Sequence, residues 1–346
     1  MKVYAGMDPR LTFPEIIAHA RRVEALGYDG IHVAETIHDS LGVALMVTEH
    51  TTRLTVRTSV TLAFTRSPTT TAYAAWDLAK FSGGRFELGL GTQIRQNIEG
   101  RYGMPFGDDP LGRLRDYVGA VRATFESFTS GTPPNFVSDH YSVTRMQPYF
   151  NPGPDADTVA PPIYMGGVQR RACALAGEIA DGFVTHPTNS NPRYLESTCL
   201  PALSDGAARR GARVTDRTFE LVIGTQVITG SSAEAVDRER ERQRRLLAFL
   251  YSTPAYKPTL ELYGWDELGP NLRSLIREDR WDSLAGLLSD EVMDTLVPTG
   301  TFEELPDLLL TRFGDLGQGI VASPPADARD DDAFRHVVEA LQAAPA

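Results

Sequence analysis

Short apolar stretches alternate with amphipathic stretches along most of the chain. The first apolar stretch, "KVYAGM" (2–7), is followed by residues whose apolar positions recur every three or four places. This spacing places one apolar face on a helix, made of Phe13, Ile16, Ile17, Ala20, Val23 and Leu26. Thr12 and Glu15 have the spacing of a capping box, and Gly27 is a typical stop signal. The pattern predicts a strand and then a helix.

The same alternation continues to the end of the chain. Strands are predicted at 2–7, 30–35, 54–64, 85–91, 162–167, 182–187, 219–230 and 317–324. Helical stretches between these strands predict a parallel sheet with right-handed crossovers. Eight is also the number of strands that closes a TIM barrel. We therefore expect an α/β fold of the (β/α)8 TIM-barrel class.

The alternative is an open, doubly wound sheet that binds a dinucleotide. That fold needs a glycine fingerprint whose third glycine lies five positions after the first. In "GLGTQI" the position five after Gly89 is Ile94, and no convincing fingerprint follows the first strand. The barrel is therefore favoured, with "LGLGTQ" as a strand that reaches its mouth, where glycines let a ligand approach the backbone.

Two segments interrupt the alternation. Residues 135–150 resemble a hairpin, and residues 237–297 form a long charged stretch with helical spacing. Residues 192–211 and a segment starting at Ser231 are also predicted to be helical, the latter with Glu234 in capping-box register. We expect a single barrel domain over residues 1–346 that carries a mainly helical insertion at about 237–297.

Charge and composition limit the partners. The formal net charge of −11 disfavours nucleic acid and anionic membranes. No apolar run approaches the roughly twenty residues that cross a bilayer, so a cytoplasmic protein is expected. The seven histidines form no HxxxH pair, and no metal site is expected.

Polar residues follow several predicted strands, at the face where TIM barrels build their active sites. These residues are Gly6, Glu35, His38, Ser59, Thr61, Thr92, Gln93, Arg95 and His186. Glu35, His38 and His186 are candidates for proton transfer. The alternative role for each is to brace a loop.

A second signal lies in "YMGGVQRRACALAGEIADG". A strand ends at Gly166-Gly167 and a helix starts at once, so that free backbone amides and the positive end of the helix dipole face the mouth. Arg170 could add positive charge. The pattern indicates an anion site, and the alternative is an ordinary tight turn.

Three segments resemble the bacterial luciferase-like superfamily, and within it the branch that uses the deazaflavin coenzyme F420. They are "GYDGIHVAET", "TSVTLAFTRSPTTTAYAAWDLAKFSGGRFELGLGTQ" and "PPIYMGGVQRRACALAGEIADGF". The similarity covers residues 1 to about 230 and resumes near 300–325. It implies a luciferase-like barrel with a non-prolyl cis peptide at Ser59-Val60, behind the cofactor ring. It also implies a phosphate site on Gly166, Gly167, Val168 and Gln169.

The resemblance implies an F420-dependent oxidoreductase that transfers a hydride to or from a small organic substrate, with an activated C=C or C=N bond as the favoured acceptor. The alternatives are an FMN-dependent monooxygenase and a non-catalytic flavin-binding barrel. Glu35-Thr36 stands where the branch's sugar-phosphate dehydrogenase has Asp-His, and Ile94 stands where it has an acidic residue. Glucose 6-phosphate is therefore not the expected substrate. Members of the family are often homodimers, and a homodimer is expected.

Overall fold

The computed structural model describes residues 1–155, 157–210 and 218–344. Its parallel strands close into a ring of eight positions, because β1 pairs with both β2 and the last strand, β13. In ring order the strands are β1 (Lys2–Gly6), β2 (Gly30–Val33), β3 (Thr55–Thr58) with β4 (Thr61–Leu62), β5 (Phe86–Gly91), β8 (Ile163–Gly167), β9 (Gly182–Thr185), β10 (Glu220–Gly224) and β13 (Gly319–Val321). The closed (β/α)8 TIM barrel predicted from the sequence is confirmed.

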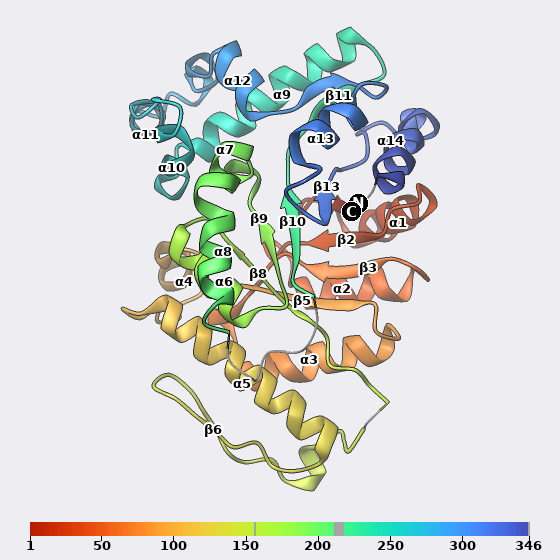
Figure 1. Cartoon of the computed structure of the whole chain (residues 1–346), viewed down its shortest axis with the longest axis vertical. Coiled ribbons are helices and arrows are strands. Elements are labelled where there is room, and N and C mark those ends of the chain that lie inside the picture. Colours follow the sequence, from red (N-terminus) through yellow and green to blue (C-terminus); the bar gives the residue numbers. More distant parts are fainter. Residues whose placement is uncertain (156, 211–217, 345–346) are drawn as a thin grey trace.

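Helices follow the strands around the outside of the ring (Figure 1). Around the barrel these are α1 (Phe13–Ala25), α2 (Ser40–Glu49), α3 (Pro68–Phe81), α4 (Arg95–Gly100), α5 (Pro110–Ser130), α6 (Arg170–Ile179), α7 (Pro192–Tyr194), α8 (Leu200–Ala207), α13 (Leu305–Phe313) and α14 (Asp331–Ala343). The capping box of Thr12 and Glu15 is present at the start of α1. A short antiparallel pair, β6 (Phe136–Val137) and β7 (Ser142–Val143), forms the predicted hairpin.

The prediction of one continuous strand over 219–230 is wrong. The chain leaves the ring after Gly224, and β11 (Ile228–Gly230) pairs outside it with β12 (Thr299–Thr301). Between β11 and β12 lie α9 (Ala233–Tyr251), α10 (Lys257–Glu261), α11 (Leu268–Arg277) and α12 (Asp290–Leu296). The cap of α9 is Ser232 instead of the predicted Ser231, because the side chain of Ser232 accepts from the amide of Ala235.

The helix predicted over 192–211 is interrupted. A five-residue π-helical segment, Leu195–Cys199, separates α7 from α8, and residue 211 lies outside the described residues. Figure 1 shows the helices α9 to α12 gathered at one end of the long axis and the β6–β7 hairpin at the other.

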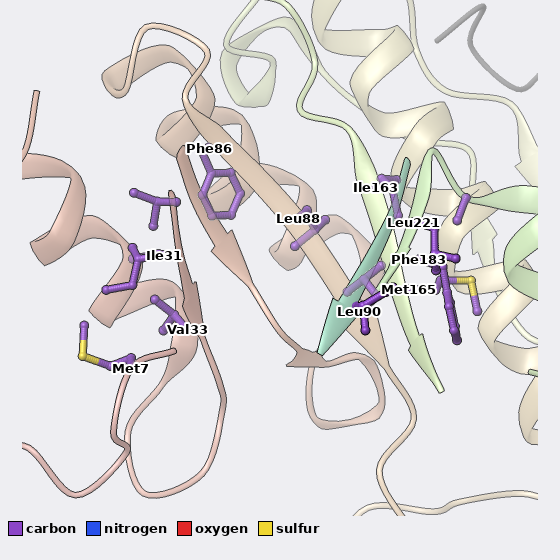
Figure 2. Close-up of a cluster of buried hydrophobic side chains, with 14 of the residues drawn as sticks. Met7, Ile31, Val33, Phe86, Leu88, Leu90, Ile163, Met165, Phe183 and Leu221 are labelled. Atoms are coloured by element: carbon purple, nitrogen blue, oxygen red, sulfur yellow. The ribbon is translucent and has the colours of Figure 1, made fainter. Parts of the chain in front are cut away.

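The main core lies between the outer face of the ring and the helices. Strand residues alternate in direction, so every second side chain points outward. Figure 2 shows such side chains on neighbouring strands, among them Ile31, Phe86, Leu88, Ile163 and Phe183. Each of these is at most 1% exposed, and all belong to one hydrophobic cluster.

The inside of the ring holds a buried ionic cluster centred on Arg57, whose side chain is fully buried. Its Nε donates to Glu87 Oε2 at 2.6 Å, and its Nη2 lies 3.6 Å from Glu220 Oε2. The hydroxyls of Tyr4 and Tyr164 donate to Glu220 at 3.0 and 2.6 Å. Burial opposes ionisation of Glu220, yet Arg57 and the tyrosine bonds hold its pKa below the usual value. This cluster joins β1, β3, β5, β8 and β10 across the inside of the barrel.

The third strand is broken by a cis peptide at Ser59-Val60, as the family resemblance predicted. The side chain of Val60 lies against β5 and β8: a Cβ on Gly91 would come within 2.6 Å of Val60 Cγ2, and one on Gly166 within 2.9 Å of Val60 Cγ1. At Gly89 a Cβ would come within 1.8 Å of the Thr58 carbonyl oxygen. The space beside these glycines is therefore filled by the protein's own third strand, and not by a ligand as the sequence suggested.

We expect Gly89→Ala to prevent normal folding or to destabilise it severely, because the added Cβ meets backbone that cannot move aside. Gly42→Ala is a matched control on α2, since a Cβ there meets nothing within 4 Å. The control should be neutral or slightly stabilising because alanine favours helices by about 1 kcal/mol over glycine. Urea denaturation followed by circular dichroism measures both. Equal stability of the two variants would contradict the packing described here.

We expect Arg57→Met to lower the free energy of unfolding by about 3–5 kcal/mol, because it leaves Glu87 and Glu220 without their buried counter-charge. The control is Arg329→Met, whose guanidinium is 90% exposed beside Asp327. Such an exposed pair contributes little to stability, because water screens both charges. A small cost for both substitutions would show that the cluster inside the barrel is not needed for stability.

Candidate active site

The strand ends bring most of the predicted site residues to one face of the barrel, because all ring strands run parallel. Gly6 ends β1, and Gly166 and Gly167 end β8. His186 follows β9, and Ser59 with Val60 forms the break between β3 and β4. Glu35 comes two residues after β2. The C-terminal mouth of the barrel is therefore the candidate active site.

Glu35 is buried and fully engaged. Its Oε1 accepts from Arg66 Nη2 at 2.7 Å, and its Oε2 accepts from Ser40 Oγ at 2.9 Å and from the Leu62 amide at 3.1 Å. Burial raises its pKa, although Arg66 opposes this shift. The carboxylate therefore joins the ends of β2 and β4. Arg66 Nη1 is buried without a partner in the described part of the chain, which leaves a cationic donor at this place.

Thr61 and His38, two other predicted site residues near Glu35, also form hydrogen bonds within the protein. Thr61 is fully buried, and its hydroxyl lies 2.9 Å from that of Ser40. His38 lies in the loop before α2, where its Nε2 is 3.0 Å from the Leu11 carbonyl oxygen. His38 therefore ties two neighbouring loops together.

The segment after β5 turns sharply into α4. Gln93 has a left-handed backbone, with φ of 60°, and its side-chain oxygen accepts from the amide of Ile94. The hydroxyl of Thr92 donates to the Gln93 carbonyl. Arg95 pairs with Glu99, four residues later on α4, at 2.9 Å, and it also donates to the Gly107 carbonyl. These bonds hold the 92–107 segment beside the mouth.

The start of α6 has the features of an anion site. Gln169 is the N-cap residue and its side chain makes no capping bond, so the first amides of the helix lack a side-chain partner. Such amides carry the positive end of the helix dipole. Arg170 pairs with Asp205 at 2.7 Å on the exposed surface, so its guanidinium is already engaged. The Tyr194 hydroxyl donates to the Val168 carbonyl and so holds the turn between β8 and α6 in place.

His186 is half-buried and lies against the insertion. Its ring stacks on that of Tyr256, with centroids 4.8 Å apart and planes 13° apart. Its Nε2 lies 3.3 Å from the Tyr256 hydroxyl, and its Nδ1 lies 2.7 Å from the Thr188 hydroxyl. Burial lowers the pKa of His186 to about 4, so the imidazole is neutral at pH 7.

Sequence reasoning missed Tyr256 as a part of this region. Tyr256 lies in a helical stretch seventy positions after His186, where nothing local marks it.

A groove of about 770 Å³ lies elsewhere, between α5 and residues 132–136. None of the predicted site residues lines it. Among the described residues, no group of three or more histidine, cysteine or acidic side chains could hold a metal ion. Within the same residues, no helix is both long and apolar enough to span a membrane.

Known proteins resemble this chain over most of its length. An uncharacterised protein of Mycobacterium tuberculosis is 37% identical over 291 residues, which is 84% of each chain. An F420-dependent glucose-6-phosphate dehydrogenase of Nakamurella multipartita is 30% identical over 262 residues, covering 71% of this chain and 72% of that protein.

Solved structures share the fold. The coenzyme F420-dependent tetrahydromethanopterin reductase of Methanopyrus kandleri superposes with a TM-score of 0.78 at 18% identity, covering 99% of this chain and 97% of its own. The profile of the luciferase-like monooxygenase family matches residues 3–317. The chain therefore belongs to the luciferase-like monooxygenase family, as the sequence predicted, and is an oxidoreductase of that family.

Proposed function

We propose that the protein is an F420-dependent oxidoreductase that moves a hydride between this deazaflavin and a small organic substrate. The observation that carries the proposal is the 30% identity, over most of the chain, to an enzyme named as F420-dependent. When bound, the deazaflavin supplies or accepts the hydride. The protein's own residues bind it, orient it and hold the proton that must move with the hydride.

The mouth of the barrel has residues that fit such a cofactor. The amides at the start of α6, with Gly166, Gly167, Val168 and Gln169 before them, would hold its phosphate. Ser59, Val60 and Thr61 would form the wall behind its ring, and Gly6, Thr92 and Gln93 would lie at the rim. Arg95 and Arg170 pair with acidic side chains at 2.9 and 2.7 Å, so their roles would be to shape the site.

The candidates for proton transfer differ in what they already bind. Glu35 has both oxygens occupied, and His38 bonds to a backbone carbonyl. His186 is a neutral imidazole. Its Nε2 contacts the Tyr256 hydroxyl, which can itself give up or accept a proton. We therefore favour His186 among the three.

An FMN-dependent monooxygenase is the alternative function, favoured by the description of the family as a whole. An activated C=C or C=N bond remains the proposed acceptor. Glucose 6-phosphate is not proposed as the substrate, because Glu35-Thr36 and Ile94 replace the residues that the sugar-phosphate enzyme has at these positions.

We expect F420 to quench the fluorescence of the apo-protein with saturable binding that is tighter than FMN binding. Gln169→Asp should weaken F420 binding at least tenfold, or about 1.4 kcal/mol, because its carboxylate would occupy the amides of α6 and repel the phosphate. Gln169→Asn is the matched control, since it caps the helix without a charge. Tight FMN binding without any response to F420 would reject the proposal in favour of the alternative.

We also propose that the protein is a homodimer joined through helices near the second to fourth strands. Ile37 is 66% exposed and Leu45 on α2 is 49% exposed, although both are large and apolar. Helices α1, α2 and α3 pack side by side and could present one surface to a second copy.

We expect the protein to elute as a dimer in size-exclusion chromatography with light scattering, and Leu45→Arg to shift it to a monomer, because a charge in an apolar interface is costly. Leu308→Arg on α13, where leucine is 37% exposed, is the control and should remain dimeric. A wild-type monomer would contradict the proposal.

A further inference from the structure

The residues after β9 connect the barrel to the insertion through polar contacts. Thr188 and Asn189 are at most 2% exposed. The Asn189 amide nitrogen donates to the Thr259 hydroxyl at 3.1 Å, and the Tyr251 hydroxyl donates to the Thr188 carbonyl at 3.1 Å. Buried hydrogen bonds therefore hold the insertion to the end of β9. Because such bonds have strict distances and angles, they fix the position of the insertion relative to the barrel.

His186 lies at the mouth on the side that faces the barrel axis. Val184, two residues earlier, belongs to the small apolar cluster inside the ring with Tyr4 and Tyr164. Because strand side chains alternate, His186 continues on the same side. Thr185 is in register with Gly167, so His186 leaves the barrel next to the turn that starts α6.

The bonds around His186 define which nitrogen carries its proton. The Thr188 hydroxyl donates its one hydrogen to the Asn189 carboxamide oxygen at 3.0 Å. It must therefore accept at its 2.7 Å contact with His186, so Nδ1 carries the proton. The Thr188 amide also points at the same Nδ1, at 3.4 Å, a longer and weaker contact than the 2.7 Å contact with the hydroxyl.

Nε2 of His186 is then a free base, and the Tyr256 hydroxyl donates to it. In the described part of the chain the Tyr256 oxygen makes no other hydrogen bond, so both of its lone pairs remain available. Tyr256 is half-buried, and burial raises its pKa, so the phenol stays protonated at pH 7.

We propose that Tyr256 is a further catalytic residue, which bonds to an oxygen or nitrogen atom of the substrate and exchanges a proton between that atom and His186. The inference rests on the proposed hydride transfer. It means that the insertion completes the active site by placing one side chain over the barrel mouth.

The step balances in the direction of substrate oxidation. The substrate's C–H bond breaks, and its electron pair leaves with the hydrogen as a hydride to the oxidised deazaflavin. The substrate's O–H or N–H proton passes to Tyr256 Oη, while the phenol proton passes to His186 Nε2. The products are a C=O or C=N bond, the two-electron-reduced cofactor and an imidazolium. In the direction of reduction His186 first takes up a proton from solvent, and the same transfers then run in reverse.

This chemistry selects among substrate classes. A carbonyl or imine that accepts a hydride on carbon takes its proton on oxygen or nitrogen, the atoms that a phenol can bond. An activated C=C bond takes its proton on carbon instead. The geometry therefore favours C=N over C=C among the acceptors considered above, and it adds C=O.

The test uses 2-cyclohexenone and 2-methyl-1-pyrroline with reduced F420, and identifies the products by mass spectrometry. The cyclic enone carries both a C=C and a C=O bond, and the imine carries only C=N. We expect 2-cyclohexenol or 2-methylpyrrolidine as the product. Tyr256→Phe keeps the stacked ring but removes the hydroxyl, so kcat should fall about 100-fold while F420 binding stays unchanged.

Tyr263→Phe is the matched control. Its hydroxyl also joins the insertion to the segment after β9, by donating to the Asn191 side chain, but it lies outside the path from Tyr256 to His186. We expect its kcat to stay close to that of the wild type. Nitrogen NMR of labelled histidine should show His186 protonated at Nδ1, with an Nε2 resonance that shifts in Tyr256→Phe and not in Tyr263→Phe.

Three results would overturn the inference. They are reduction of the C=C bond alone, equal kcat in Tyr256→Phe and wild type, and intact F420 binding without turnover of either compound. Failure of the wild type to bind F420 at all would instead reject the proposed function on which the inference rests.

Discussion

The contact between Arg57 and Glu87 inside the barrel is the interaction on which the rest of the structure depends. A guanidinium removed from water is stable only when its charge is compensated and its donors are used. Glu87, Glu220 and the tyrosines meet this condition from strands on opposite sides of the ring. The cluster therefore fixes where these strands lie relative to one another, and the mouth residues follow it along the same strands.

The mouth is arranged by two further constraints that act on neighbouring strands. Val60 fills the space that Gly91 and Gly166 leave open, so β4, β5 and β8 approach one another closely. On the other side, His186 and the residues after it bond to the insertion instead of packing through apolar contacts. Apolar packing tolerates small sliding, whereas buried hydrogen bonds have strict distances and angles. Steric fit thus holds the side of the mouth at β4, β5 and β8, and hydrogen bonds hold the side at His186.

The regular parts of the fold could be predicted from the sequence because they depend on local patterns. Alternating apolar stretches predicted the order of the ring strands, and Thr12 with Glu15 predicted the start of α1 correctly. The division of 219–230 could not be seen, because its apolar pattern continues after the chain has left the ring. The cis peptide was predicted only through the family resemblance, since no local spacing indicates it.

The candidate site was less predictable because its parts are distant in sequence. Strand ends identified Glu35 and His186 as mouth residues, but burial and partners, which decide what each can do, depend on the folded chain. Arg57 sits in the apolar strand "TVRT", where a single charge gives no sign of whether it faces water or a buried partner. Tyr256 meets His186 only because the insertion folds back over the barrel.

The pairing of β11 with β12 has a consequence for how this family can diversify. The two strands run parallel and side by side outside the ring, so the chain departs and returns at a single place. Whatever lies between them has its own apolar centre, built from residues such as Leu247, Leu272 and Met293. Evolution or design could exchange this whole unit, and with it the residue presented above β9, while the eight ring strands keep their sequence and spacing.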